Sequence, residues 1–447
     1  MESVRGETET VTAADDSVAL VSRACEIPDV SYTAFLDAQD GARTLWAGPD
    51  GLEVAGGGAA VRLTGTGDDR FDEVRAAAES VFEGADLATP EAARPRLLGG
   101  CAFFADHEPS GTWERFPAAE FVLPRVQLTR AEGTTWLTVT RTGAEATPET
   151  VERDLAATRD RIGELPAMRP SGGSPGVVDT RLGTSREDWT ASVASAVERI
   201  ESGELVKVVL ALAQAADLAG PVDPTTLLAR LRRSYPDCYR FLLQPDGAGA
   251  FFGAPPERLV RLTGRSVSTE ALAGSAARGE TPAEDAELAE QLRDSEKIQH
   301  EQALVAEAIR EQLAGVAEVT VGEQTIRKLA TIQHLRTPIE ARLHGDEHVL
   351  RLVEALHPTP AVGGVPPEAA SAVIRDTEPF DRGWYAAPVG WFDAAGDGEF
   401  AVGIRSAVAD GDTVTMFAGN GIVADSDPAA EWEEVQLKFR PILDELR

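Results

Sequence analysis

One lysine of this chain lies in a segment where an amine could do chemistry. The chain has 42 Lys and Arg residues against 74 Asp and Glu residues, and its only lysines are Lys207, Lys297, Lys328 and Lys438. Lys207 stands in the run VKVVLALA (206–213), whose alternating faces are otherwise apolar, so the run predicts a strand buried on both sides. Burial there disfavours the charged ammonium, and a neutral amine could act as a base. The alternative is a lysine at a strand edge that reaches water.

Glu257 is a candidate proton donor. It follows two prolines in the run FFGAPPERLV (251–260), between two apolar strand-like segments. A carboxyl buried between strands has a raised pKa and could act as a general acid. The alternative is a turn glutamate paired with Arg258 or Arg261.

Two predicted helices carry carboxylates that could bind a cation. Helical spacing places Glu301 on an otherwise apolar face, where a buried carboxylate needs a metal ion or an arginine as its partner. Farther along the chain, Glu431, Glu434 and Lys438 share one helix face. Such spacing is typical of surface ion pairs, but two carboxylates on an inward face could instead hold a hard cation such as Mg²⁺.

Two further features carry less information. The segment MFAGNGIV (416–423) predicts a strand that enters a turn at Gly419 and Gly421, where backbone N–H groups could approach an anion. The pattern is neither a dinucleotide-binding fingerprint nor a P-loop. His334 follows an apolar run, and because no two histidines have zinc spacing, a structural histidine is the alternative.

Strand-like and helix-like segments alternate irregularly, which predicts an α+β fold rather than a regular parallel array. Residues 150–165 predict a charged helix, and Ser185 is expected to cap another. The intervening residues 166–184, rich in Pro, Gly and Ser, are interpreted as a linker or surface loop. The expected organisation is therefore an N-terminal part (1–165), this linker, and a larger part (185–447).

The composition limits the class of partner. A formal net charge of −32 repels nucleic acid and anionic membranes. Abundant acidic residues with scarce lysine are typical of halophile proteins, and a high-GC genome with an acidic bias is the alternative. No run reaches the roughly 20 apolar residues of a membrane helix, and the N-terminal segment lacks the apolar core of a secretory signal, so a cytoplasmic protein is expected. The three cysteines are odd in number and widely spaced, which predicts free thiols.

In this order, the segments resemble the chorismate-utilising enzymes, which include the isochorismate, salicylate, anthranilate and aminodeoxychorismate synthases. The motifs that carry the resemblance cover about 185–447: KVVLA, GAPPERLV, EALAGSAARG, SEKIQHEQALV, TIQHLRTPI, LHPTPAVGG, EPFDRGWYAAPVGW, FAVGIRSA, FAGNGIV and EWEEVQLK. The resemblance implies antiparallel β-sheets in a sandwich-like core flanked by helices, with both parts of the chain intertwined.

The resemblance also implies a role for each matching residue. Lys207 would activate a water for attack on C2 of chorismate, and Glu257 would protonate the departing C4 hydroxyl. Glu301 and Glu434 would bind Mg²⁺, and Glu431 would act through a water. The substrate would be held by Gly274, Ser275, His334, Ala361, Tyr385, Arg405, Gly419, Gly421 and Lys438.

Within the family, the residues favour an isochorismate synthase that acts without an obligate protein partner, with menaquinone biosynthesis as the default pathway. Lys207 resembles the branch that attacks with water, since the anthranilate branch typically has glutamine there. Ala273 stands where the aminodeoxychorismate branch has lysine. Ala361 stands where salicylate synthases, which go on to eliminate pyruvate, usually have threonine. A salicylate synthase and a catalytically silent chorismate-binding subunit are the alternatives.

Three residues depart from the usual family motifs. Leu212 replaces an arginine, Ile298 replaces an acidic residue, and Asn420 stands in the middle of the glycine turn. The departures leave the expected acid, base and direct metal ligands intact, but they could alter substrate affinity or metal dependence.

Overall fold

The computed structural model describes residues 9–11, 19–166, 172–247, 249–329 and 332–447. The strands are β1 (Glu9–Val11), β2 (Leu20–Ile27), β3 (Arg43–Ala47), β4 (Glu53–Gly65), β5 (Asp86–Ala88), β6 (Arg96–Cys101), β7 (Ala119–Ala131), β8 (Thr134–Thr142), β9 (Val177–Leu182), β10 (Lys207–Leu218), β11 (Arg240–Gln244), β12 (Ala250–Gly253), β13 (Arg258–Thr263), β14 (Ser266–Ala277), β15 (Ala317–Val321), β16 (Thr325–Lys328), β17 (Ile332–Leu343), β18 (Gly364–Val365), β19 (Pro388–Asp393), β20 (Gly398–Val402), β21 (Ser406–Asp410) and β22 (Thr413–Ile422). The α-helices are α1 (Tyr32–Asp37), α2 (Arg70–Phe82), α3 (Pro148–Gly163), α4 (Arg186–Glu201), α5 (Pro224–Ser234), α6 (Pro282–Asp294), α7 (Glu296–Leu313), α8 (Val349–Leu356), α9 (Pro367–Thr377) and α10 (Pro428–Leu446).

Antiparallel pairing links most of the strands into one long ladder. The ladder runs from β9 through β10, β22, β21, β12, β11, β3, β4, β7, β6, β19, β20, β13 and β14 to β17. The strands β3, β4, β6 and β7 therefore lie in the middle of the ladder, although they come from the first third of the chain. Phe241 of β11 pairs with Trp46 of β3, and Val389 of β19 pairs with Gly100 of β6. Hydrogen bonding thus joins the two parts of the chain that the sequence analysis separated at 166–184.

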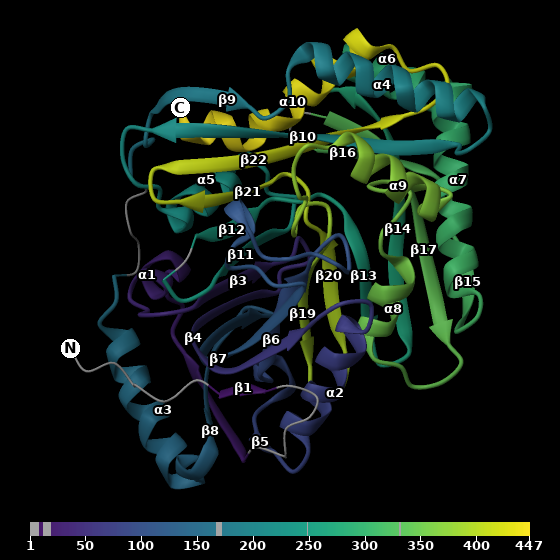
Figure 1. Cartoon of the computed structure of the whole chain (residues 1–447). Helices are drawn as coiled ribbons and strands as arrows, with labels where there is room; N and C mark the ends of the chain where they lie inside the picture. Colours follow the sequence, from purple (N-terminus) through teal and green to yellow (C-terminus); the bar gives the residue numbers. More distant parts are fainter. Residues whose placement is uncertain (1–8, 12–18, 167–171, 248, 330–331) are drawn as a thin grey trace.

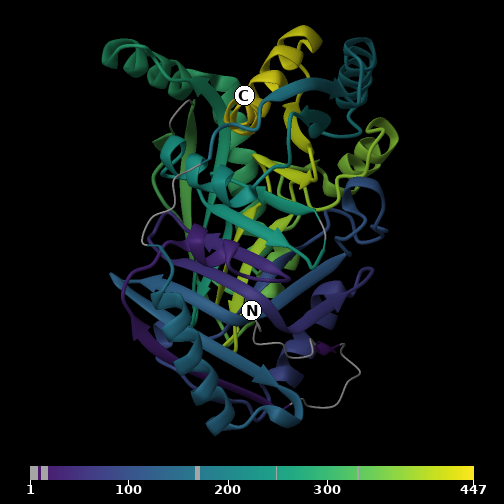
Figure 2. The ribbon, with the colours of Figure 1, turned by 90° about the vertical axis from the view of Figure 1, so that its left-hand side faces the viewer.

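The helices lie on the outside of the strands, as Figure 1 shows. Helix α7 packs along β14 and β17, α10 packs on β22, and α3 packs on β2. In Figure 2 the N-terminal strands, in purple and blue, occupy most of the lower half, and the teal-to-yellow strands lie mainly above them, with some yellow-green strands reaching down between them. This mixed antiparallel architecture confirms the predicted α+β class. In the described part of the chain, no helix is long and apolar enough to span a bilayer.

The two helices predicted between residues 150 and 200 are present, but part of the predicted linker between them is a strand. The helix predicted at 150–165 is α3, and Ser185 caps α4 by accepting a hydrogen bond from the Asp188 N–H. Within the segment interpreted as a linker, residues 167–171 lie outside the described residues, but Val177–Leu182 forms β9 at the edge of the ladder. Within the described residues β9 pairs with β10 alone and most of its side chains are exposed, while the Pro- and Gly-rich residues before it have the composition of a loop.

A cluster of aromatic side chains fills the core between distant segments. Trp113 stacks on Phe417 with ring centroids 5.3 Å apart and meets the edges of Phe116 and Phe251. Trp384 packs against the same two phenylalanines. Because these rings come from four separate segments, the cluster fixes those segments relative to one another.

Replacing Trp113 by alanine should lower the free energy of unfolding by about 3–5 kcal/mol, because a buried indole and its hydrogen bond to the Asp381 carbonyl are lost. Urea denaturation measures this change. Trp136→Ala, at a half-buried tryptophan of β8, is the matched control and should cost less. Equal losses in the two variants would contradict a structural role for the aromatic cluster.

Candidate active site

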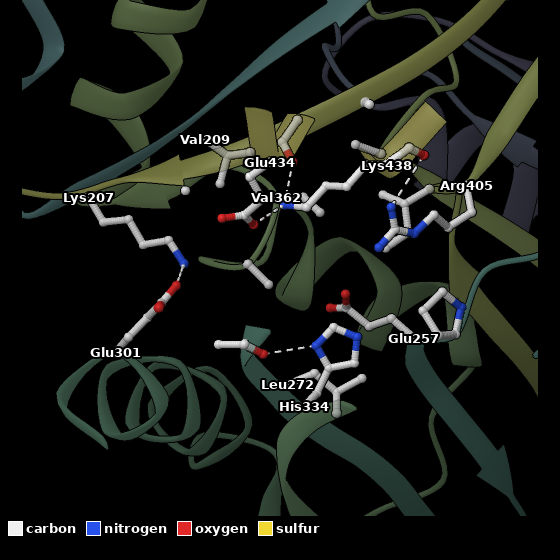
Figure 3. A pocket seen from close by; sticks show the side chains of 18 of the residues that line it. Lys207, Val209, Glu257, Leu272, Glu301, His334, Val362, Arg405, Glu434 and Lys438 are labelled. Carbon is white, nitrogen blue, oxygen red and sulfur yellow. Dashed lines mark hydrogen bonds and ion pairs between the residues drawn. The ribbon is translucent and has the colours of Figure 1, made fainter. Parts of the chain in front are cut away.

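A cavity of about 300 Å³ opens among β10, β22, β14, α7 and α10. Of the residues predicted to form a site, those that line it are Lys207, Glu257, Gly274, Glu301, His334, Ala361, Tyr385, Arg405, Gly419, Gly421, Glu431, Glu434 and Lys438. The side chain of Ser275 lies outside the described part of the structure. The close-up in Figure 3 shows side chains from several elements pointing into one space.

Several apolar residues of the cavity wall were not predicted as site residues from the sequence: Val209, Pro256, Leu272, Val362, Ala386, Ile404, Phe417 and Ala418. A strand turns alternate side chains to the same face. Val209 therefore accompanies Lys207, Leu272 accompanies Gly274, and that spacing would have found both.

Lys207 is buried, with 3% of the residue exposed. It starts β10, beside β18 and close to β22. Its Nζ donates a hydrogen bond to Glu301 Oε1 of α7 at 2.5 Å. A Cβ at Gly421 would lie 2.8 Å from Lys207 Cε, so the glycine leaves room for the lysine to cross the strand. The burial contradicts the alternative of a solvent-exposed lysine at a strand edge.

Glu257 follows β12 in the buried segment before β13, and 7% of it is exposed. Burial and, to a smaller extent, the nearby Glu270 carboxylate raise its pKa to about 8, although Lys207 and Arg327 act in the opposite direction. Arg258, one proposed partner in the alternative reading, instead pairs with Glu399 and Asp50. At neutral pH the Glu257 carboxyl therefore holds a proton.

The face of α10 predicted from the sequence turns toward the cavity. Glu434 is half-exposed and pairs with Lys438 at 2.9 Å. Glu431 is nearly buried and accepts hydrogen bonds from Asn420 Nδ2 at 3.1 Å and Ser426 Oγ at 2.8 Å. Two carboxylates and an ammonium on this face thus line the cavity, which excludes the alternative that they form ion pairs on the outer surface.

Arg405 and Tyr385 lie at one corner of the cavity, where the backbone is strained. Arg405 and Ala386 have φ values of 51° and 60°, in the left-handed region that side chains other than glycine rarely adopt. The Tyr385 ring stacks on Phe417 at 5.3 Å, and burial raises the pKa of its hydroxyl to about 12. Arg405 Nη1 donates to the Lys438 carbonyl at 3.3 Å. This corner therefore places a guanidinium and a neutral phenol at the same wall.

His334 Nδ1 lies 2.9 Å from the carbonyl oxygen of Gly274. Burial lowers the pKa of His334 to about 4, so the ring is neutral, and the carbonyl partner assigns the proton to Nδ1. Gly274 has a φ of 62°, and a Cβ there would lie 2.3 Å from Ile298 Cγ2. The position therefore requires glycine.

A buried ion pair lies behind the cavity wall. Arg382 pairs with Glu378, and both side chains are almost entirely shielded from solvent. The guanidinium donates to the carbonyls of Val209 and Val362, at 2.7 and 2.9 Å. Glu378 accepts from the backbone N–H of Ala211 at 2.8 Å. One ion pair therefore joins β10 to the segment that carries Ala361 and Val362.

Three carboxylates of the cavity are the donor type that Mg²⁺ prefers: Glu301, Glu431 and Glu434. Glu301 is paired with Lys207, and Glu434 is paired with Lys438. Within the described residues, no three acidic, histidine or cysteine side chains converge on one point. The carboxylate oxygens fit a magnesium ion, which would take the place of a lysine as the partner of Glu301 or Glu434.

The model of a protein family described as chorismate binding enzyme matches residues 7–447. The chain belongs to this family. As a chorismate-binding enzyme, it has relatives of closely similar length. It is 38% identical over 433 residues to the salicylate biosynthesis isochorismate synthase of Pseudomonas aeruginosa, and the alignment covers 95% of this chain and 89% of that protein. It is 33% identical over 420 residues to an isochorismate synthase of Bacillus subtilis, with coverage of 91% and 88%.

A solved structure gives the same result for this chorismate-binding enzyme. The menaquinone-specific isochorismate synthase from Escherichia coli superposes with a TM-score of 0.80 at 28% identity, and the match covers 97% of each chain. The predicted family is thereby confirmed, together with the predicted fold. Of the three departures from the family motifs, Ile298 lines the cavity, Asn420 contacts Glu431, and Leu212 is buried in β10.

Replacing Glu257 by glutamine should change how stability depends on pH. Between about pH 4.5 and 8 the folded enzyme keeps a proton on Glu257 that the unfolded chain releases, so the wild type loses stability as pH rises through this window. The variant has no such proton. Its free energy of unfolding relative to wild type should therefore rise by a few kcal/mol from about pH 5 to pH 8.5, as urea denaturation at each pH would show.

Glu201→Gln, at an exposed glutamate, is the control and should give a flat difference. If the free energy of unfolding of Glu257→Gln relative to wild type also did not change with pH, the pKa of Glu257 would have its ordinary value.

Proposed function

We propose that the enzyme is an isochorismate synthase, which converts chorismate to isochorismate by adding a hydroxyl at C2 and losing the C4 hydroxyl. The observation that carries this proposal is that a buried lysine, Lys207, and a protonated glutamate, Glu257, line the same cavity. The names of the full-length relatives support it.

Lys207 and Glu257 supply complementary proton transfers in this proposal. Lys207 accepts a proton from a water that attacks C2, and the ring double bonds shift. Glu257 donates its proton to the C4 hydroxyl, which leaves as water. The two side chains come from different elements and enter from opposite sides of the view in Figure 3, which suits attack and departure on separate ring carbons. The raised pKa of Glu257 keeps the proton available at neutral pH.

The charges of the cavity favour a dianionic substrate together with a divalent cation. With Lys207 neutral, as its role as a base requires, and Glu257 protonated, the cations Arg405 and Lys438 share the cavity with three carboxylates, those of Glu301, Glu431 and Glu434. A magnesium ion held by Glu301 and Glu434, with Glu431 acting through a water, would supply the positive charge that matches the two carboxylates of chorismate.

The remaining cavity residues are proposed to hold the substrate. Arg405 and Tyr385 provide a cation and a hydroxyl for the pyruvyl carboxylate, and the backbone at Gly419 and Gly421 lies on the adjoining strand. The ring would lie against a neutral wall, to which Gly274, His334 and Ala361 contribute. Lys438 would lie beside the ring carboxylate, and Ser275 remains a proposed substrate contact from the sequence.

The later use of the product is a finer proposal. Menaquinone biosynthesis is supported by the similarity to the menaquinone-specific synthase from Escherichia coli. The relative in Pseudomonas aeruginosa is named for salicylate biosynthesis, and both names share the formation of isochorismate.

Product analysis tests the reaction itself. Incubation with chorismate and Mg²⁺, at low and at multimolar salt, should give isochorismate without pyruvate, and EDTA should abolish turnover; chromatography with mass detection identifies the products. Salicylate and pyruvate above the spontaneous background would assign a salicylate synthase. Ammonia-dependent formation of anthranilate, or binding without conversion, would contradict the proposal.

Lys207→Ala should bind chorismate and lose at least about a hundredfold in kcat, because the attacking water loses its base. Steady-state kinetics and calorimetric binding measure the two effects. Lys328→Ala is the matched control, since Lys328 pairs with Asp285 away from the cavity. Near-normal turnover of Lys207→Ala would show that another group is the base.

A further inference from the structure

Asn420 is a buried residue of β22 between the two glycines that line the cavity. Only 1% of it is exposed, and it pairs with Leu210 of β10. Neighbouring residues of a strand turn to opposite faces. While Gly419 and Gly421 face the cavity, the Asn420 side chain is therefore directed toward α10, where its hydrogen-bond partners lie.

The Asn420 amide makes three hydrogen bonds to α10. Nδ2 donates to the Glu431 carbonyl at 2.8 Å and to Glu431 Oε2 at 3.1 Å. Oδ1 accepts from Lys438 Nζ at 2.6 Å. The same ammonium donates to the carbonyl of Gly419 at 3.0 Å and pairs with Glu434 at 2.9 Å. The three donors of Lys438 thus have three acceptors, of which only one is charged.

We propose that Asn420 is a positioning residue that fixes the Lys438 ammonium and the Glu431 carboxylate on the same wall and sets the balance between metal and substrate binding. The inference rests on the proposed function, because it concerns the side of the cavity assigned to the metal ion and the ring carboxylate. A neutral amide is suited to this task because it donates to a carboxylate and accepts from an ammonium without altering the charge of either group.

The chemistry of the amide predicts opposite effects of two substitutions on metal affinity. Without the amide, in Asn420→Ala, Lys438 loses a neutral acceptor and pairs more closely with Glu434, which competes with a cation for that carboxylate. In Asn420→Asp, a further carboxylate pairs with Lys438, and the wall becomes more negative. A cation should then bind more tightly and a dianionic substrate less tightly.

The first test measures Mn²⁺ binding to the resting, substrate-free enzyme by the loss of the free-ion EPR signal. Asn420→Ala should weaken Mn²⁺ binding by roughly three- to tenfold, and Asn420→Asp should strengthen it by a similar factor. Ser426→Ala is the matched control, because Ser426 donates to Glu431, whereas Lys438 bonds to Asn420, Gly419 and Glu434. It should loosen Glu431 alone.

The second test is calorimetric binding of chorismate with saturating Mg²⁺. Both Asn420 variants should bind chorismate more weakly, Asn420→Asp by about tenfold or more, while Ser426→Ala stays within about twofold of wild type. Folding is checked by thermal melting, and the alanine variant, which places no carboxylate against Glu431, keeps the test valid if the aspartate variant does not fold.

Folded variants with wild-type affinity for both Mn²⁺ and chorismate would overturn the proposal and leave Asn420 a packing residue. A change of the same sign in Mn²⁺ affinity for both variants would also overturn it. Turnover of the wild type is measured separately, so a failure of the proposed reaction is distinguished from a failure of the positioning role.

Discussion

Glu378 and Arg382 lie side by side behind the cavity, almost completely removed from solvent. Taking two charges out of water costs several kcal/mol per ion, and their mutual attraction offsets this cost only when further hydrogen bonds satisfy both groups. Here the carbonyls of Val209 and Val362 and the N–H of Ala211 provide those bonds. The pair helps to hold β10 in place, and with it Lys207, because it bonds to the backbone of Val209 and Ala211 in that strand.

The cavity contains carboxyl groups in two different environments, and the difference separates their roles. Glu257 lies among buried strands near Glu270, which favours its protonated form. Glu301 and Glu434 instead face lysine ammonium groups from β10 and α10. Residues of one chemical type therefore favour a bound proton in one place and pair with lysine side chains in another, as their surroundings require.

Much of this arrangement could be predicted from the sequence because it depends on local periodicity. The apolar run around Lys207, the prolines before Glu257 and the helical spacing of Glu431 and Glu434 placed these residues on the correct elements. The resemblance to a known family then predicted that these residues share one site, which their spacing in the sequence could not show.

Contacts between distant segments were not predictable from such patterns. Lys207 and Glu301 are separated by 94 positions, so their ion pair depends on how α7 packs against the strands. The same holds for the bonds of Asn420 to α10, which the sequence marked only as a departure from a motif. The edge strand β9 was interpreted as part of a loop because the segment that leads into it is rich in Pro, Gly and Ser, and its pairing with β10 depends on a distant strand.

The order of strands in the ladder has a consequence for synthesis of the chain. β6 is made early, yet its neighbour β19 begins 287 positions after β6 ends at Cys101. At translation rates of about 5–20 residues per second, that edge waits roughly 15–60 s for its partner. Through this interval the nascent chain presents an apolar strand edge, the kind of surface on which neighbouring chains aggregate. The surplus of negative charge spread along the polypeptide keeps such nascent chains apart by repulsion, so the acidic composition protects the protein before it has folded as well as after.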